Sequence, residues 1–181
     1  VRRINDAFFG GPIHCETKRL LAGDYMWIAR KEGAEDQVLD CIIERKSLND
    51  LVLSVTTTSN TYAPLNRMQV QMKKLESTTL DNKIFLLEKS NTGACAQFTK
   101  RGAFCKATKF ATSVKQGDYP GFWYKQTSCI NDTLRFLVDK HELMRNKVKQ
   151  AYSQALAQKE KGVSVDEQML KRSPFAPIGT I

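Results

Sequence analysis

The apolar positions of this 181-residue chain follow two different periods. Stretches rich in β-branched and aromatic residues predict strands, and apolar residues spaced three and four apart predict helices. The predicted strands are 13–20, 25–30, 38–46, 83–89 and 122–127. The predicted helices are 48–55, one opening at Asn66, 94–114 and one over 130–159, with a weaker helical pattern over 1–9. This order of strands and helices predicts an α/β domain with a mixed sheet flanked by helices.

Two of the predicted helices have a clear apolar face. The helix that opens at Asn66 carries Met68, Met72 and Leu75 on one side. The last helix has a longer stripe, formed by Ile130, Leu134, Leu137, His141, Met144, Val148, Ala151 and Ala155. The whole pattern predicts one domain over residues 1–160. Residues 161–181, with two prolines and two glycines, are predicted to form a loose C-terminal tail.

The charge balance points to an anionic partner. Lys and Arg number 28 against 19 Asp and Glu, giving a net charge of +9. Nucleic acid is the leading candidate for such a partner, and simple solubility is the alternative. The apolar runs are too short to span a bilayer, so no membrane-spanning segment is expected. Five cysteines without a closely spaced pair, and two distant histidines, disfavour a zinc site or a Ser-His-Asp triad and favour a reducing compartment.

The chemistry of the chain is concentrated around the predicted strand over 38–46. Alternation along a strand places Glu44 and Lys46 on one face and Arg45 on the other. Asp24 begins the neighbouring predicted strand, after Gly23, whose lack of a side chain allows a close approach of the backbone. An Asp from one strand and a Glu from the next can share Mg²⁺ or Mn²⁺, and the lysine can hold water or phosphate. Taken singly, each pattern is ordinarily a solvated ion pair or a turn.

In combination, these residues resemble a known family. Gly23-Asp24-x-x-Trp27, followed by Glu44-Arg45-Lys46-x-x-x-Asp50, is similar to the nuclease domain of the XPF-type structure-specific endonucleases. Within that family the pattern is most like the catalytic subunits of the Mus–Eme crossover junction endonucleases. The resemblance implies a restriction-endonuclease-like fold and Mg²⁺-dependent cleavage of flaps, forks and nicked junctions in DNA repair and recombination.

The same resemblance implies roles for individual residues. Asp24 and Glu44 would be the metal ligands, with Lys46 at the reaction centre. Arg45 and Asp50 would complete the catalytic set, and Arg45 is expected to pair with Asp50 or to contact phosphate. The DNA-binding residues implied on the helix after the motif are Arg67, Gln71, Lys73 and Lys74.

Three departures from the family pattern limit this inference. Residues 1–22 do not match the acidic strand that members carry before the Gly-Asp pair, so either the sequence is truncated or cleavage is impaired. Val70 and Met72 stand where the family helix has Glu and Lys. The tandem helix-hairpin-helix module of the family is not visible. A nuclear location and a heterodimer with a non-catalytic Eme-like partner subunit, paired through 121–124 and the helix from Ile130, are further implications of the resemblance.

Three alternative interpretations of the chain, and the roles of several other residues, stay open at this point. The chain could be a non-catalytic DNA-binding partner or an inactive truncated homologue of the same fold, or an unrelated basic α/β scaffold. Asp40 is expected to be solvated or salt-bridged. Glu88 is expected to be a surface acid, the alternative being that it approaches the site if its strand lies next to the strand of Glu44. Trp27 and Trp123 are expected to be core or interface anchors.

Overall fold

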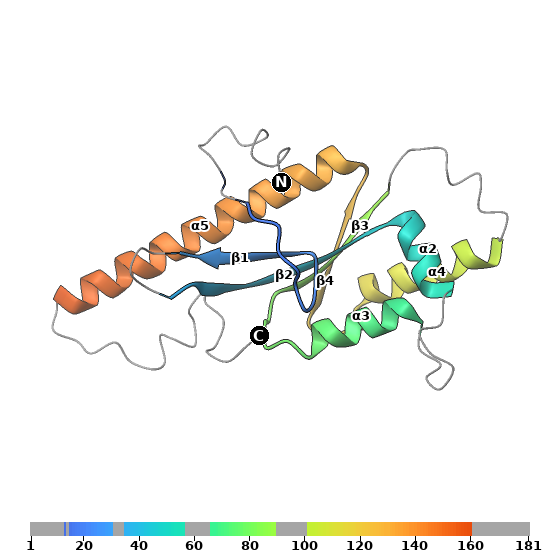
Figure 1. The fold of residues 1–181 in the computed structure, drawn as a ribbon, viewed down its shortest axis with the longest axis horizontal. Helices are drawn as coiled ribbons and strands as arrows, with labels where there is room; N and C mark the ends of the chain where they lie inside the picture. Colours follow the sequence, from blue (N-terminus) through green and yellow to red (C-terminus); the bar gives the residue numbers. More distant parts are fainter. Residues whose placement is uncertain (1–12, 14, 31–34, 57–65, 90–100, 161–181) are drawn as a thin grey trace.

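The structure is a computed structural model that describes residues 13, 15–30, 35–56, 66–89 and 101–160. The described residues form a four-stranded sheet in the order β1-β2-β3-β4 (Figure 1). The strands are β1 (Tyr25–Ala29), β2 (Gln37–Ser47), β3 (Lys83–Glu88) and β4 (Phe122–Thr127). β1 pairs with β2 antiparallel, whereas β2, β3 and β4 are parallel to one another. The predicted mixed sheet is therefore confirmed.

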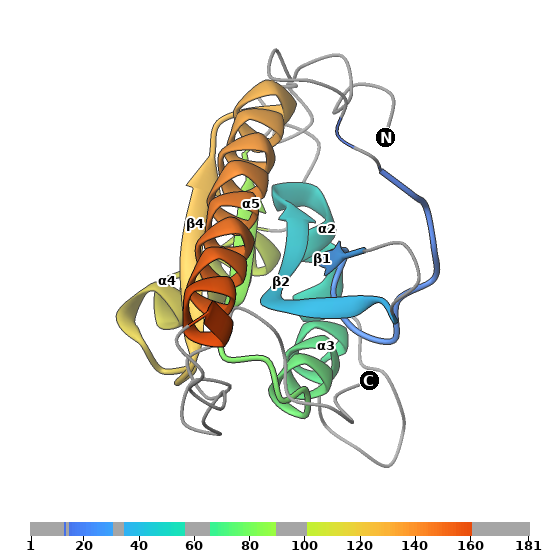
Figure 2. The same ribbon diagram turned by 90° about the vertical axis from the view of Figure 1, so that its left-hand side faces the viewer.

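Helices cover both faces of this sheet. α2 (Leu48–Thr56), α3 (Arg67–Glu76) and α4 (Arg101–Gln116) pack on one face, through residues such as Leu51, Met72 and Phe110. α5 (Ile130–Glu160) lies along the other face, as Figure 2 shows, and buries Leu137 and Met144 there. In parallel sheets covered on both sides, strands are apolar almost throughout. This accounts for the continuous burial of β3 from Ile84 onward.

The alternation predicted for β2 agrees with its packing. Leu39, Cys41 and Ile43 face α5, whereas Ile42 belongs to the core beneath α2, α3 and α4. Cys41 is fully buried, as expected of a cysteine that acts as a small apolar residue. Because successive residues of a strand point to opposite faces, Glu44 and Lys46 share the side of Ile42, and Arg45 takes the side of α5.

The beginning of α3 agrees with the sequence. Asn66 is its N-cap: the Asn66 side chain accepts from the Gln69 backbone N–H at 2.9 Å, and the Gln69 side chain accepts from the Asn66 N–H at 3.0 Å. This reciprocal capping box satisfies two backbone donors that the first turn would otherwise leave without partners. Met68, Met72 and Leu75 are fully buried, as their spacing predicts.

The strand predicted over 13–20 is wrong. Residues 15–20 have no regular structure, and the four residues from Glu16 to Arg19 are all exposed. Glu16 instead pairs with Lys18 at 3.0 Å and with Arg30 at 2.9 Å. A stretch that buries neither face gains little from joining a sheet. The predictions for 1–9, for the loop after residue 56, for 94–100 and for the tail over 161–181 lie outside the described residues. Within the described part of the chain, no helix is long and apolar enough to cross a membrane.

Gly23 brings the start of β1 close to β2. Its φ is +71°, a conformation that other residues rarely adopt. A Cβ at this position would lie 2.6 Å from Ile42 Cγ1 and 3.2 Å from the carbonyl oxygen of Ile43. Gly23 thus gives both the turn and the close approach that seat Asp24 beside β2.

Gly23→Ala is expected to lower the free energy of unfolding by about 2–4 kcal/mol, because a left-handed backbone cost adds to a clash in the core. Gly117 has a φ of +89° but open space around its Cα, so Gly117→Ala is the matched control. It should cost only about 1–2 kcal/mol. Urea unfolding of the two variants measures the difference, and equal losses would show that Gly23 is not needed for close approach.

Candidate active site

Asp24 and Glu44 lie beside each other at the junction of β1 and β2. The Asp24 backbone N–H donates to the Ile43 carbonyl at 2.7 Å, and Asp24 Oδ2 accepts from the Arg45 N–H at 2.8 Å. Tyr25 pairs with Ile43 in the antiparallel ladder, so the same register carried one residue further sets Asp24 opposite Glu44. The negative charge of Asp24 also acts on Glu44, raising its pKa. The two predicted metal ligands are therefore brought together.

Glu44 is a buried carboxylate, with 3% of its surface exposed. The pKa of Glu44 is raised, mainly by burial and further by the charge of Asp24, while Lys46 acts in the opposite direction. Lys46 Nζ lies 3.1 Å from Glu44 Oε1, and the Lys46 side chain is itself largely buried. Lys46 is thus held against the Glu44 carboxylate, as the sequence predicts for a lysine that shares the face of Glu44.

A divalent cation fits these two carboxylates. Glu44 Oε1 is buried and its charged neighbour is the Lys46 ammonium at 3.1 Å; an ionised carboxylate oxygen has more than one lone pair, so it can accept a cation as well. Mg²⁺ prefers hard carboxylate oxygens and is commonly held by one or two of them, with water and phosphate completing its coordination. Among the described residues, no group of three or more Asp, Glu, His or Cys side chains is placed to hold a metal. From their positions immediately before β1 and on the neighbouring β2, Asp24 and Glu44 would hold the ion as a pair of protein ligands.

Arg45 differs from the sequence prediction. Its guanidinium binds Glu88 in a two-pronged arrangement, with Nε to Oε2 at 3.0 Å and Nη2 to Oε1 at 2.6 Å. Thr133 of α5 donates to the same carboxylate at 2.7 Å. The expected pairing with Asp50 is wrong, and so is the expectation that Glu88 is a surface acid, since Glu88 is 4% exposed. In the sequence, Glu88 directly follows the apolar run 84–87 of a strand expected to be buried. This position is the signal that could have indicated a buried Glu88 with a cationic partner.

Asp50 and Asp40 each support a nearby turn. Asp50 Oδ2 accepts from the Ser47 hydroxyl at 2.7 Å, and that hydroxyl accepts from the Asp50 N–H at 3.1 Å, so the pair caps the start of α2. The carboxylate of Asp50 in the first turn also favours the helix dipole. Asp40 was expected to be solvated or salt-bridged; it instead accepts from the backbone N–H of Asp81 at 2.7 Å and from the amide side chain of Asn82 at 2.6 Å. It fixes the loop that leads into β3.

The predicted DNA-binding residues of α3 fall into two groups. Arg67, Lys73 and Lys74 are exposed, as phosphate contacts require. Gln71 is half-buried, and its amide oxygen is buried without a hydrogen-bond partner. A partner for that oxygen would have to be a hydrogen-bond donor, which a phosphate is not.

Comparison with known proteins decides the family. Residues 4–170, which include every residue of the candidate site, match the ERCC4 domain. This chain belongs to the ERCC4-domain family. The family supports the restriction-endonuclease-like assignment of the mixed sheet and its flanking helices. The XPF-type resemblance in the sequence is therefore confirmed.

Several curated proteins are similar to this chain over about 70% of its length. The chain is 31% identical over 148 residues to the crossover junction endonuclease mus81 of Emericella nidulans, covering 72% of this chain and 20% of the relative. It is 30% identical over 131 residues to the crossover junction endonuclease MUS81 of Kluyveromyces lactis, covering 70% and 18%. A probable crossover junction endonuclease mus81 of Dictyostelium discoideum is 25% identical over 149 residues, covering 75% and 15%. The chain therefore spans about a fifth of the length of these relatives or less.

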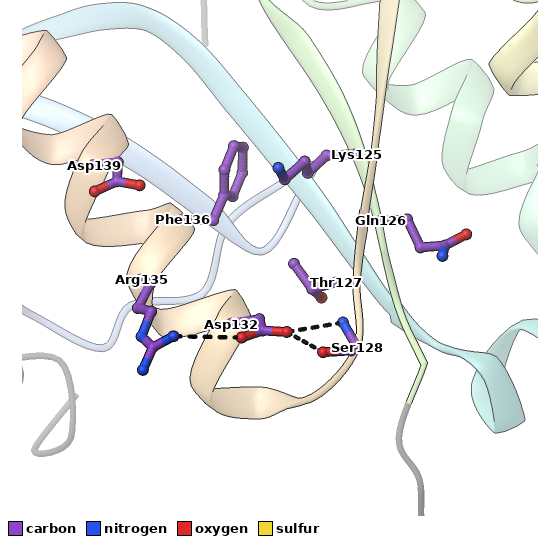
Figure 3. Close-up of a pocket in the computed structure, with 8 residues that line it drawn as sticks. All are labelled: Lys125, Gln126, Thr127, Ser128, Asp132, Arg135, Phe136 and Asp139. Carbon is purple, nitrogen blue, oxygen red and sulfur yellow. Dashed lines mark hydrogen bonds and ion pairs between the residues drawn. The ribbon is translucent and has the colours of Figure 1, made fainter.

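A pocket lies in another part of the ERCC4 domain, between the end of β4 and the start of α5 (Figure 3). Asp132 points toward Ser128, whose backbone N–H and hydroxyl both donate to it, and Arg135 lies 3.9 Å away. A carboxylate in the first turn that binds the residue before the helix stabilises the helix start. Lys125 packs with its ammonium 5.2 Å from the centre of the Phe136 ring. Asp132, Ser128 and Lys125 thus make local contacts within the pocket.

The pairing of Glu88 makes the stability of the domain depend on pH. Burial acts to raise the pKa of Glu88, but hydrogen bonds from Arg45 and Thr133 and the charge of Arg45 outweigh it, and the pKa is lowered. The stabilisation that ionised Glu88 gives the folded domain is therefore complete above the pKa of Glu88 in the unfolded chain, about 4.3. It is lost as the pH falls through the lower pKa of Glu88 in the folded domain.

Glu88→Gln is expected to lower the free energy of unfolding at pH 7 by about 2 kcal/mol, because an ion pair becomes a neutral hydrogen bond beside a partly buried cation. The difference from wild type should shrink as the pH falls below about 4. Urea unfolding at pH 7, 5 and 3.5 measures this, with the exposed Glu142→Gln as control. A difference that stays constant with pH would contradict the assigned ion pair.

Proposed function

We propose that this chain is the nuclease module of a structure-specific DNA endonuclease that hydrolyses phosphodiester bonds at flaps, forks and nicked junctions in DNA repair and recombination. Membership of the ERCC4-domain family and the similarity to crossover junction endonucleases support this class of enzyme. The observation that carries the proposal is the buried Glu44 carboxylate, which lies beside Asp24 and contacts the Lys46 ammonium at 3.1 Å.

The residues of this site have different proposed roles. Asp24 and Glu44 would hold Mg²⁺, with Mn²⁺ as the alternative, because both offer hard oxygen ligands on one side of the sheet. When bound, the ion stabilises negative charge on the phosphate and lowers the pKa of water. Lys46 places a positive charge next to the carboxylates, where it orients water or the phosphate and opposes the charge that develops on oxygen. Because Lys46 is largely buried, this charge is less screened by solvent.

The exposed cations of α3 are proposed to bind the DNA backbone. Arg67, Lys73 and Lys74 are exposed on a chain of net charge +9. Contacts to phosphate position a protein on DNA and are lost as salt increases. If about five phosphates are neutralised, the slope of log affinity against log salt should be near −4.5. Gln71 stays in the proposed set through its amide N–H₂ group, which can donate to phosphate.

The outer edge of the sheet and α5 are the proposed surface for a non-catalytic Eme-like partner subunit. β4 is an edge strand of the described sheet, and 68% of the Trp123 surface is exposed on it. α5 adds four exposed apolar side chains, from Ile130, Leu143, Tyr152 and Leu156. Large exposed apolar residues gathered on neighbouring elements are typical of protein interfaces. With such a partner and a DNA substrate, the nucleus is the proposed location.

The proposed function is tested by cleavage of labelled DNA with the full-length protein and its partner. A fork, a 3′ flap, a nicked junction and a linear duplex of the same sequence are compared in Mg²⁺ and in Ca²⁺. We expect cleavage of the branched substrates in Mg²⁺, little cleavage of the duplex, and binding without cleavage in Ca²⁺. Equal cleavage of duplex and branched DNA, or no cleavage in Mg²⁺, would overturn the proposal.

Arg67→Ala is expected to weaken binding of forked DNA several-fold and to make the salt slope less negative by about 0.9, because one phosphate contact is lost. The cleavage rate at saturating protein should stay within about twofold of wild type, since Arg67 is not at the reacting phosphate. Fluorescence anisotropy over a salt series measures the slope. Arg135→Ala is the control, as Arg135 is exposed on α5. An unchanged affinity and slope would remove Arg67 from the DNA interface.

A further inference from the structure

A chain of buried polar groups connects four elements on the face of the sheet opposite to Glu44. It begins at Arg45 of β2, passes through Glu88 at the end of β3, and continues to Thr133 of α5. Thr133 shares a second hydrogen bond with Thr127, at the end of β4, with an oxygen–oxygen distance of 2.7 Å. Glu88, Thr127 and Thr133 are each at most 5% exposed. We call these four residues the Arg45–Glu88 network.

The register of the sheet brings the network together. Ser47 of β2, Glu88 of β3 and Thr127 of β4 are directly paired neighbours across the parallel strands. Figure 3 shows Thr127 at the end of β4, beside the first turns of α5. The network therefore ties the C-terminal ends of three strands to one helix. The network lies at the last residues of these strands. The end of a strand has fewer neighbouring residues to restrain it than the middle has.

Arg45 is the point at which this network reaches the candidate active site. Its side chain leaves β2 toward α5, away from the face that carries Glu44 and Lys46. Its backbone N–H donates to Asp24 Oδ2 at 2.8 Å. A two-pronged bond to a buried carboxylate fixes both the position and the orientation of a guanidinium. Because the Arg45 side chain is fixed, its backbone N–H, which donates to Asp24, is fixed as well. The orientation of the adjacent residues Glu44 and Lys46 is restrained in the same way.

We propose that Glu88 and Thr133 are positioning residues, which act through Arg45 to hold Asp24, Glu44 and Lys46 in the geometry that binds the metal ion. The proposal rests on the proposed function, because it assigns that site as the reaction centre. It also assigns Arg45 a task distinct from phosphate binding: the guanidinium is engaged with Glu88 on the far face. Hydrogen-bond partners behind metal ligands commonly change metal affinity or activity by about 10–100-fold when removed.

The test uses the full-length protein with its partner and three variants of the network. Glu88→Gln weakens the bond to Arg45, Thr133→Val removes the hydroxyl, and Thr133→Ser retains it as a conservative rescue. Leu137→Ala is the matched control for stability: Leu137 is buried on the same face of α5, one turn further on, and has no place in the network. All measurements are made well below the melting temperature of each variant, so that the folded protein is compared.

Three quantities are measured: the single-turnover rate of fork cleavage in Mg²⁺, the affinity for the fork in Ca²⁺, and Mn²⁺ binding without DNA by electron paramagnetic resonance. For Glu88→Gln and Thr133→Val we expect Mn²⁺ binding and the cleavage rate to fall by about 10-fold or more. Fork affinity should stay within about twofold, because these groups are buried away from DNA. Thr133→Ser should recover most of the loss, and Leu137→Ala should lower stability without weakening Mn²⁺ binding.

The outcomes separate this inference from the proposed function. Wild-type protein that neither binds Mn²⁺ nor cuts the fork would overturn both. Wild-type protein that does both, with Glu88→Gln and Thr133→Val unchanged in Mn²⁺ binding, would overturn the positioning role and leave the proposed function standing. An equal loss of Mn²⁺ binding in Leu137→Ala would show that stability alone is responsible and would also overturn it. Weaker fork binding in Glu88→Gln with unchanged Mn²⁺ binding would identify Arg45 as a phosphate contact instead.

Discussion

Glu44→Gln, made in the full-length protein together with the proposed partner, is expected to lower the single-turnover rate of fork cleavage by at least about 100-fold, the loss typical of one essential electrostatic group. The amide is nearly the same shape as the carboxylate, so the change removes charge rather than volume. Glu44 is the buried member of the proposed ligand pair. Among the described residues, no third Asp, Glu, His or Cys side chain lies with this pair and could replace Glu44 as a ligand.

Binding of the same fork in Ca²⁺ should change less than about threefold, because most DNA contacts are made to phosphates elsewhere. Glu76→Gln, at the exposed end of α3, is the control for a change of charge on this side of the domain. Quenched-flow cleavage of a labelled fork gives the rate, and anisotropy gives the affinity. If Glu44→Gln cuts as fast as wild type, Glu44 is not part of the reaction centre and the domain is a DNA-binding scaffold.

Lys46→Ala is expected to reduce cleavage by two or more orders of magnitude, about 3 kcal/mol of transition-state stabilisation. The ammonium is the cation that contacts Glu44, at 3.1 Å, so its loss removes positive charge from the site and leaves two neighbouring carboxylates uncompensated. The pKa of Glu44, already raised by burial and by Asp24, should rise further. The remaining activity should therefore require a higher pH, since the ligand must be ionised to bind a cation.

The pH–rate profile separates this explanation from a simple loss of DNA affinity. Wild type and Lys46→Ala are compared from pH 5.5 to 9 at saturating DNA, with Lys89→Ala as control. Lys89 is exposed immediately after β3. A profile for Lys46→Ala that is lower but has the same shape would show that Lys46 does not influence the ionisation of Glu44. An unchanged rate would exclude Lys46 from the reaction centre.

The sequence predicted those features of the site that depend on neighbouring residues. The period of two along β2 correctly separates Glu44 and Lys46 from Arg45, because strand geometry alone decides which face each residue takes. Gly23 was correctly expected to permit close approach, and its environment confirms this. Asn66 was correctly expected to open α3.

The sequence did not predict which side chains pair with the charged groups inside the fold, such as Arg45 with Glu88. Arg45 and Glu88 are 43 residues apart, and their contact depends on β3 lying next to β2 after two intervening helices. From the sequence alone, Asp50 was the nearer acid for Arg45, and it instead caps α2 with Ser47. The strand expected over 13–20 failed for a similar reason. Alternation is needed for a strand, but a covered face is also needed, and the exposed Glu16–Arg19 stretch has none.

The most direct measurement is anomalous diffraction from crystals of the full-length protein grown with Mn²⁺. The central claim is that Asp24 and Glu44 share one cation next to Lys46. We expect an anomalous peak within about 2.2 Å of an oxygen from each carboxylate, close to the distances of a small divalent cation. A peak bound by other residues, with Glu44 still contacting only Lys46, would contradict the account.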